Sequence, residues 1–318
     1  MATFYIKHIT KYSYSSSVID GANLIRLHPA IDGYQKVLSH TITISTNGFV
    51  QTFTDFFNNT IGTFMSIEPH DFLTIQSEVE VTTSHRPYPD DTADIKTQWD
   101  ELKTLKNQSD FIDFLSFKQF SGSNDILDIL ETKDLNTNSP YIIVQELCDY
   151  IFNNFKYIQG VTNVDSSLDD VWKLKAGVCQ DFSNVLLQMV RMLGIPARYV
   201  SGYICTTENS TRGEGATHSW IEAYIPFYGW LGLDPTNNII TNENHVRLAI
   251  GRNYDDCSPV KGVFKGKVDE DLYVKVEVNT KKDNTDSVIP PNTFTESQSN
   301  NSYKLNLERI QQQQQQQQ

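Results

Sequence analysis

The chain has 318 residues and a formal net charge of −13, and 39% of its residues are hydrophobic. This apolar content is enough for folded cores, which excludes a wholly disordered chain. An acidic chain repels phosphate groups, so we expect no nucleic-acid partner. The sequence has no run of 18 apolar residues and no recognisable secretory signal. We therefore expect a cytoplasmic protein with no membrane partner.

Residues 1–84 are predicted to form a β-sandwich-like domain. Alternating segments such as TFYIKHITKYSYS and LTIQSEVEVTT are separated by turn formers, including Asp32-Gly33 and Asn47-Gly48. Short alternating runs without helices between them are typical of a sandwich. The segment HRPYPDD then brings two prolines and several charges. It indicates the start of a region, residues 85–139, that holds a linker and short helices.

Residues 140–280 are predicted to form an α+β core in which a helix packs on an antiparallel sheet. Ser139-Pro140 opens one helix, because proline is favoured in the first helical turn. A second helix has one apolar face and ends at Gly194. Strand-like segments follow it, namely ARYVSGYIC, HSWIEAYI, GWLGLDP and VFKGKVDEDLYVKVEV. Residues 281–318 are polar, end in a glutamine tract and are predicted to be a disordered tail.

Cys179 is the candidate nucleophile among the four cysteines. None of them lies in a CxxC pair, so the sequence predicts neither a zinc site nor a redox dithiol. Cys148, Cys205 and Cys257 are interpreted as structural. Cys179 lies at the start of the second helix, where unpaired N–H groups and the helix dipole favour a thiolate. For a single cysteine, a buried and unreactive role is the more common alternative.

His218 and Asp234 are the candidate partners of Cys179. His218 opens a strand-like segment 39 residues after Cys179, and Asp234 ends the next such segment. Two adjacent antiparallel strands would place Asp234 beside His218, where a carboxylate orients an imidazole. The opposite ring nitrogen would then face Cys179. Taken singly, the histidine is more simply a half-buried strand residue and the aspartate a turn former.

Taken together, three segments resemble the transglutaminase-like superfamily, and more narrowly its bacterial-type members with a β-rich N-terminal region. They are GVCQDFSNVLLQMVRMLGIPARYVSGYI, ATHSWIEAYIPFYGWLGLDPTNN and HVRLAIGRNYDDCSPVKGVFKG, and they cover most of residues 150–266. Residues 1–84 resemble the N-terminal region more weakly, through HPA, the turn between Asp55 and Gly62, and EPHDFLTIQSEVEV.

The resemblance implies a papain-like core with a triad in which Cys179 is the nucleophile, His218 the base and Asp234 the orienting acid. Two positions depart from the family pattern. The segment FFNNTIG is looser than the usual Gly-Asn after the N-terminal aspartate, and Asn253 stands where an acidic residue is usual. Neither departure affects the triad.

The implied reaction is acyl transfer from a protein or peptide amide through a thioester on Cys179. An amine acceptor gives transglutamination, whereas water gives amidase or protease activity. A non-catalytic scaffold that kept the fold is the alternative from another class. The mechanism requires neither a cofactor nor a metal.

Several other residues receive secondary interpretations. The backbone N–H of Cys179 is an expected oxyanion donor, and Tyr157 and Trp172 are candidates for a second donor, although packing roles suit both better. Asp181 is expected to cap the helix that follows Cys179. The remaining histidines are interpreted as structural or surface residues: His8, His28, His40, His70, His85 and His245.

Overall fold

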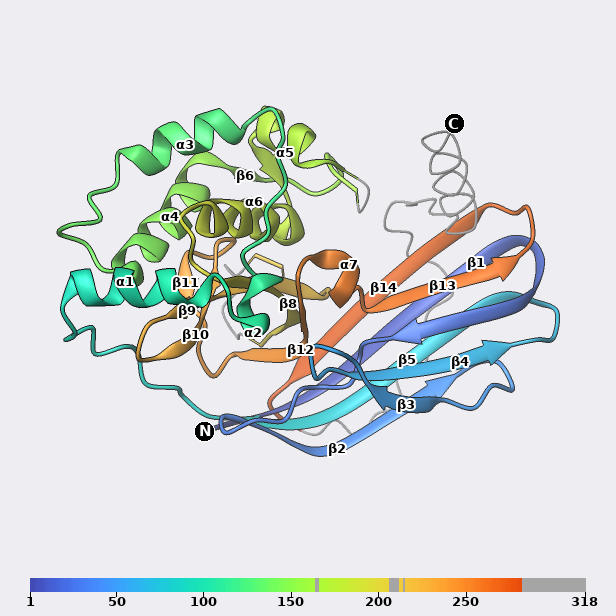
Figure 1. Ribbon diagram of the computed structural model, residues 1–318. Coiled ribbons are helices and arrows are strands. Elements are labelled where there is room, and N and C mark those ends of the chain that lie inside the picture. The colour runs from blue at the N-terminus through green and yellow to red at the C-terminus, as the bar shows by residue number, and fades with distance from the viewer. Residues whose placement is uncertain (164–165, 206–211, 214, 282–318) are drawn as a thin grey trace. The chain divides into compact units, whose positions relative to one another are not determined.

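The computed structural model describes residues 1–281, except 164–165, 206–211 and 214. The described chain forms two compact units. One unit consists of residues 83–257, which we call the core unit, and the other joins residues 2–82 to the segment from Ser258 onward (Figure 1). Apart from residue 281, the predicted C-terminal tail lies outside the described residues. No helix among the described residues is long and apolar enough to cross a membrane.

The second unit is built around one long strand, β1 (Ala2–Ile25). The strand order is β2-β5-β1-β4-β3, and β13 and β14 also pair with β1 (Figure 1). The other strands are β2 (Gln35–Ile44), β3 (Gln51–Thr54), β4 (Thr60–Ser66), β5 (His70–Thr83), β13 (Val260–Lys265) and β14 (Glu270–Asn279). In β5, alternate side chains are buried from Leu73 to Val81, as the period of a strand requires. The strand-rich character predicted for residues 1–84 is confirmed.

The last two strands belong to this unit, which corrects the predicted extent of the core. The sequence analysis placed residues 258–280 within a core of residues 140–280. Instead, β14 pairs antiparallel with residues 5–14 of β1, and β13 pairs with residues 19–25. Alternating hydrophobicity predicts that a segment is a strand but does not identify the strand with which it pairs. The sequence pattern therefore does not reveal pairing between strands that lie far apart in the chain.

The core unit combines a five-stranded antiparallel sheet with helices. The sheet order is β11-β10-β9-β8-β12, with β8 (Ala197–Ile204), β9 (His218–Ile225), β10 (Gly229–Asp234), β11 (Ile239–Ile240) and β12 (His245–Gly251). The helices are α1 (Ile95–Leu105), α2 (Ser109–Ile112), α3 (Ser123–Glu131), α4 (Pro140–Asn154), α5 (Leu168–Leu174), α6 (Cys179–Met192) and α7 (Tyr254–Cys257). A short parallel pair, β6 (Lys156–Tyr157) and β7 (Ala176–Gly177), precedes α6.

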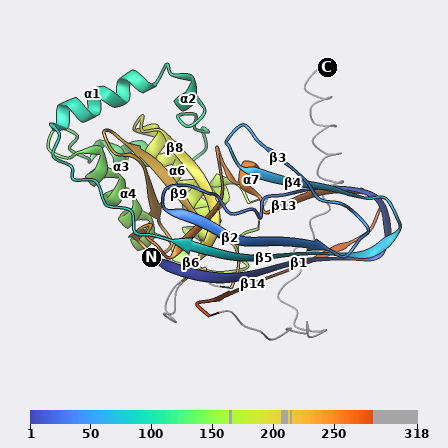
Figure 2. The same cartoon turned by 90° about the horizontal axis from the view of Figure 1, so that it is seen from below.

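Helix α6 forms the centre of the core unit. It contacts β8, β9 and α4, and Figure 2 shows it beside the sheet strands. Phe182, Leu186 and Val190 are fully buried along it. The chain leaves the helix through Gly194, whose φ of +79° suits glycine. The predicted α+β class, with a helix packed on an antiparallel sheet, is confirmed.

The expected helix start at Ser139-Pro140 is also confirmed. The Ser139 hydroxyl accepts a hydrogen bond from the backbone N–H of Ile142, and Pro140 occupies the first turn of α4. Residues 85–139 contain three helices, as predicted, and two of them bury leucine or isoleucine side chains such as Leu102 and Ile126 in the core. This region is therefore part of the core unit.

We predict that Leu147→Ala lowers the free energy of unfolding of the core unit by about 2–5 kcal/mol. Leu147 is 0% exposed in α4, so truncation leaves a cavity that the packed helices fill incompletely. All four tryptophans lie within residues 83–257, so denaturant unfolding followed by tryptophan fluorescence reports on this unit. The matched control is Leu127→Ala, because Leu127 is 44% exposed. Its effect should stay within about 0.5 kcal/mol. Equal losses in both variants would contradict the prediction.

Candidate active site

Cys179 is the first residue of α6, and its local backbone is held by Asp181. The Asp181 carboxylate accepts hydrogen bonds from the backbone N–H of Val178, at 2.8 Å, and from the Thr162 hydroxyl, at 2.6 Å. The expected capping role of Asp181 is confirmed. A side chain at Gly177 would overlap the Asp181 carboxylate, so glycine is required here for close approach. These contacts fix the turn that delivers the Cys179 thiol.

His218 and Asp234 are brought together by two neighbouring strands. His218 opens β9 and Asp234 ends β10, and these strands pair antiparallel as the sequence predicted. His218 Nε2 lies 2.8 Å from Asp234 Oδ2, and both side chains are 0% exposed. The carboxylate also accepts backbone hydrogen bonds from Thr236 and Asn237 through Oδ1. The imidazole is therefore held at one edge by a buried and well-supported charge.

The second nitrogen of His218 is the one available to Cys179. Nδ1 is buried and makes no geometrically complete hydrogen bond among the described residues. Asp234 occupies Nε2, so Nδ1 is the ring nitrogen that is left to interact with Cys179. The structure thus brings the three predicted site residues together in the predicted order.

The charges in this cluster shift the pKa values of all three groups. Burial raises the pKa of the Cys179 thiol, but the neighbouring His218 ring and its positive charge outweigh this and bring the pKa below its ordinary value. Burial by itself lowers the pKa of His218, but the charge of Asp234, its hydrogen bond to the ring and the interaction with Cys179 together outweigh burial and raise the pKa to about 10. The same pairing overcomes burial at Asp234 and lowers the pKa of that carboxyl. The arrangement favours a thiolate beside an imidazolium.

The other cysteines lack this environment. All four are free thiols, and Cys148, Cys205 and Cys257 are buried. Burial raises the pKa of Cys148 and of Cys205, so both remain protonated and unreactive near neutral pH. Their environment agrees with the structural role expected from the sequence.

The two candidate oxyanion donors have different surroundings. Trp172 donates its indole N–H to Asp125 Oδ2 at 2.8 Å and is 5% exposed, so that N–H is already used within the fold. Tyr157 is half-buried with its ring near Phe182. Burial raises the pKa of Tyr157 to about 12, and a negative charge on Cys179 contributes to the rise. The Tyr157 hydroxyl therefore lies close enough to the Cys179 sulfur to interact with it electrostatically.

Asn237 is a contact of the site that sequence reasoning missed. Its side-chain N–H group donates to Asp234 Oδ2 at 2.9 Å and to the Arg212 carbonyl at 3.2 Å. Its side-chain oxygen accepts from the Arg212 backbone N–H. Asn237 therefore links the buried carboxylate to residues that precede β9. In the sequence, the Asn-Asn pair after Asp234-Pro235-Thr236 is typical of an ordinary turn. Its one signal for this role is that asparagine side chains in turns often form hydrogen bonds with nearby groups.

Gly213 lies directly against the His218 ring. Its φ is +89°, and a side chain at this position would overlap His218 Nδ1. Only glycine therefore allows the backbone to approach the ring nitrogen that serves Cys179. The position sits in a Gly-containing loop that the sequence analysis did not single out.

His245 and Ser219 complete the surroundings of the three residues. His245 Nε2 lies 3.5 Å from Asp234 Oδ2, although the sequence analysis gave His245 no role. The Ser219 hydroxyl lies 3.2 Å from the Ser183 hydroxyl of α6, and hydrogen bonding to Ser219 is among the causes that lower the pKa of Cys179. Both residues reach the site from the sheet rather than from a motif next to Cys179.

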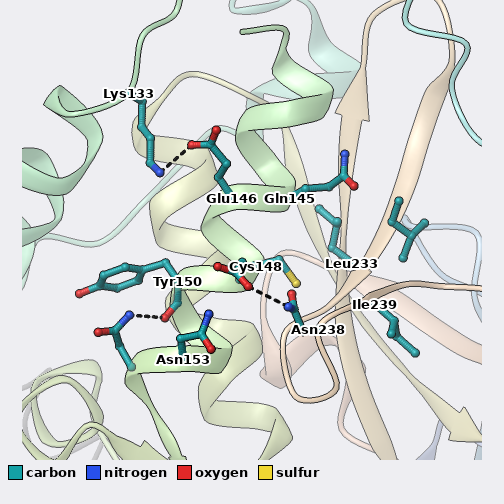
Figure 3. A pocket seen from close by; sticks show the side chains of 12 residues that line it. Lys133, Gln145, Glu146, Cys148, Tyr150, Asn153, Leu233, Asn238 and Ile239 are labelled. Carbon is teal, nitrogen blue, oxygen red and sulfur yellow. Dashed lines mark hydrogen bonds and ion pairs between the residues drawn. The ribbon is translucent and has the colours of Figure 1, made fainter.

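A separate cavity of about 550 Å³ opens beside α4, β10 and β11 (Figure 3). None of Cys179, His218 and Asp234 lines it. Its charged and amide groups are largely paired with each other, as in the contacts of Lys133 with Glu146 and of Asn238 with Asp149 (Figure 3). Among the residues that the structure describes, no group of three or more acidic, histidine or cysteine side chains is arranged to hold a metal ion.

Comparison with known families confirms the resemblance drawn from the sequence. Residues 129–235 match the transglutaminase-like superfamily, and residues 4–82 match the bacterial transglutaminase-like N-terminal region. An uncharacterized protein of Mycobacterium leprae is 29% identical over 276 residues, which cover 86% of this chain and 97% of the relative. One from Mycobacterium tuberculosis is 28% identical over 273 residues, covering 81% of this chain and 86% of the relative.

A solved structure with the same fold is that of a "putative cysteine protease" from Cytophaga hutchinsonii. It superposes with a TM-score of 0.68 at 21% sequence identity, covering 89% of this chain and 92% of the other. A protein-glutamine gamma-glutamyltransferase of Pseudomonas aeruginosa is 30% identical over 83 residues, which are 24% of this chain and 12% of the relative. Together with the family match, the structural likeness shows that this chain has the transglutaminase-like fold.

We predict that Gly213→Ala slows alkylation of the Cys179 thiol by on the order of tenfold or more, because displacement of the His218 ring by the new methyl group disturbs a closely set geometry. The matched control is Gly215→Ala. Gly215 also has a positive φ, of +82°, but nothing lies within 4 Å of a side chain there. The two variants therefore share the backbone strain and differ in the overlap with His218. Alkylation rates that fall equally in both would contradict the prediction.

Proposed function

Since this chain combines a transglutaminase-like core with the bacterial transglutaminase-like N-terminal region, we propose that Cys179, His218 and Asp234 are the catalytic triad of a cysteine-dependent acyl transferase acting on protein or peptide amides. The observation that carries the proposal is the buried His218–Asp234 pair beside a thiol whose pKa is lowered. This arrangement supports the roles of Cys179 as nucleophile, His218 as base and Asp234 as orienting acid.

The first half of the reaction forms a thioester. The Cys179 thiolate attacks the carboxamide carbon, and the negative charge moves to the carbonyl oxygen. The backbone N–H of Cys179, at the start of α6, is suitably placed in the chain to stabilise this oxyanion. When the tetrahedral intermediate collapses, the carbon–nitrogen bond breaks and the His218 imidazolium donates its Nδ1 proton to the leaving amine or ammonia.

The second half transfers the acyl group to an acceptor. Neutral His218 takes a proton from an incoming amine or water as the acceptor attacks the thioester carbon. The carbon–sulfur bond then breaks, and the Cys179 thiolate and His218 imidazolium are restored. An amine acceptor gives a new amide, whereas water gives a carboxylic acid. Asp234 remains ionised throughout and keeps Nε2 protonated, so that Nδ1 is the nitrogen that exchanges the proton.

Both acceptors remain candidates, and each finds support in one comparison. The Pseudomonas relative is named as a gamma-glutamyltransferase, which corresponds to an amine acceptor. The Cytophaga structure is named as a cysteine protease, which corresponds to water. We favour acyl transfer to an amine because the matched family is transglutaminase-like. A glutamine-containing peptide, incubated with and without a primary amine, distinguishes the two: an amine adduct indicates transfer, whereas free glutamate or a cleaved peptide indicates hydrolysis.

We predict that iodoacetamide labels Cys179 selectively near neutral pH. The pKa of the Cys179 thiol is lowered from its ordinary value, whereas burial raises the pKa of Cys148 and of Cys205, so the thiolate fraction of Cys179 exceeds theirs. His218→Ala removes the two largest causes that lower this pKa, the interaction with the ring and its positive charge, while burial remains, so the pH of half-maximal labelling should move upward. Mass spectrometry of the labelled peptides measures the site, and rates from pH 5 to about 9 measure the pKa.

The control for this experiment is Cys205→Ser, which removes a buried thiol that is not part of the proposed triad. It should leave both the rate and the pH midpoint unchanged. Slow labelling spread evenly over all four cysteines would overturn the assignment of Cys179 and leave the non-catalytic scaffold as the better hypothesis.

A further inference from the structure

The carboxylate of Asp234 is shared between two histidines. Oδ2 lies 2.8 Å from Nε2 of His218 and 3.5 Å from Nε2 of His245. His245 opens β12, which β8 and β9 separate from β10, the strand that carries Asp234. The side chain of His245 is 2% exposed and that of Asp234 is 0% exposed. A second imidazole thus reaches the same buried oxygen from a distant strand.

A tight turn sets the orientation of the His245 ring. The backbone N–H of His245 donates to the Asn242 carbonyl, and the backbone N–H of Asn242 points at His245 Nδ1 at 3.3 Å. The side-chain oxygen of Asn242 lies equally close to Nδ1, at 3.3 Å, so the turn holds the ring in place but does not by itself assign its proton. The carboxylate of Asp234 can only accept a hydrogen bond, so its contact with Nε2 requires the proton to be on that nitrogen. His245 is therefore placed as a hydrogen-bond donor to Asp234.

The ring of His245 is also held by packing. It meets the ring of Trp220 edge to face, with centroids 5.2 Å apart and an interplanar angle of 80°. Trp220 lies two residues after His218 in β9, and its ring lies 6.3 Å from that of His218. The two histidines therefore border the same tryptophan and bind the same carboxylate. A shift of His245 would therefore change the position of His218, through Trp220 and through Asp234.

We propose that His245 is a positioning residue that fixes the Asp234 carboxylate for His218 by donating a second imidazole hydrogen bond to Oδ2. The inference rests on the proposed function of the triad. A carboxylate can rotate about its carbon–carbon bond, and the backbone donors of Thr236 and Asn237 hold only Oδ1. His245 and the side chain of Asn237 hold Oδ2, so the oxygen that receives His218 Nε2–H stays in place.

The arrangement also limits how strongly Asp234 binds the proton of His218. Each donor to Oδ2 withdraws part of the negative charge that this oxygen offers to the others. His245 therefore steadies the carboxylate while leaving it ionised, which suits a base that must release and recover a proton at Nδ1.

The test compares His245→Gln with His245→Leu in the full chain. Glutamine carries a side-chain N–H donor at nearly the place of Nε2, whereas leucine fills similar space without a donor. We expect His245→Leu to slow iodoacetamide labelling of Cys179 by about tenfold, the effect of losing one hydrogen bond to a charged group. His245→Gln should stay within about threefold of the parent protein, because it keeps that hydrogen bond.

A spectroscopic readout accompanies the rates. The Nε2–H proton of His218, bonded to a buried carboxylate, gives a separate proton NMR signal that reports directly on the His218–Asp234 hydrogen bond. We expect this signal to shift in His245→Leu and to keep its position in His245→Gln. Leu248→Ala is the control, because it removes a buried side chain from the same strand β12 and should leave the signal unchanged.

The outcomes separate the two proposals. If the parent protein shows no selective labelling of Cys179, the proposed function fails, and the NMR signal still decides whether His245 supports Asp234. If labelling is selective but His245→Leu matches the parent in rate and signal, the positioning role of His245 is wrong and the triad stands. Equal losses in His245→Leu, His245→Gln and Leu248→Ala would reduce His245 to a packing residue and also overturn the inference.

Discussion

The site depends on the burial of one negative charge. Asp234 is fully enclosed, and a carboxylate taken out of water is stable only when donors replace the lost solvent. Two backbone N–H groups, one amide and two imidazoles surround it. The ends of β10, β9 and β12 converge on this charge. The high proton affinity of His218, and through it the lowered pKa of Cys179, both follow from it.

The principal features of the site could be predicted because they are local. A cysteine at a helix start, and a histidine and an aspartate on consecutive antiparallel strands, are positioned by short-range rules of helix and hairpin geometry. The capping role of Asp181 could be predicted for the same reason, because it depends on neighbouring residues in the chain. His245, Asn237 and Gly213 were missed because each reaches the site through a loop or a non-consecutive strand. Their residue types match ordinary turn and strand positions, and only the folded chain shows which of them meet.

The same distinction explains the domain boundary. Period-two alternation identified β13 and β14 as strands, but chain continuity suggested that they extend the preceding sheet. Their pairing with β1 depends on contacts between residues such as Tyr5 and Asn279, at opposite ends of the described chain. The helices of residues 85–139 show the reverse case. The prolines and charges of HRPYPDD suggested a linker ahead of short helices, whereas a few buried side chains such as Leu102 and Ile126 attach these helices to the core.

Pairing between the two ends of the chain also orders events during synthesis. Strands β4 and β5 emerge soon after β1, but β13 and β14 are made only after the whole of residues 83–257. At bacterial or eukaryotic elongation rates, that interval is roughly 10–40 s. The core unit can complete its fold on the ribosome during this time, while one flank of β1 remains without its neighbouring strands. A truncated product that ends near Cys257 would therefore retain Cys179, His218 and Asp234 and expose an unpaired strand edge, a form prone to aggregation.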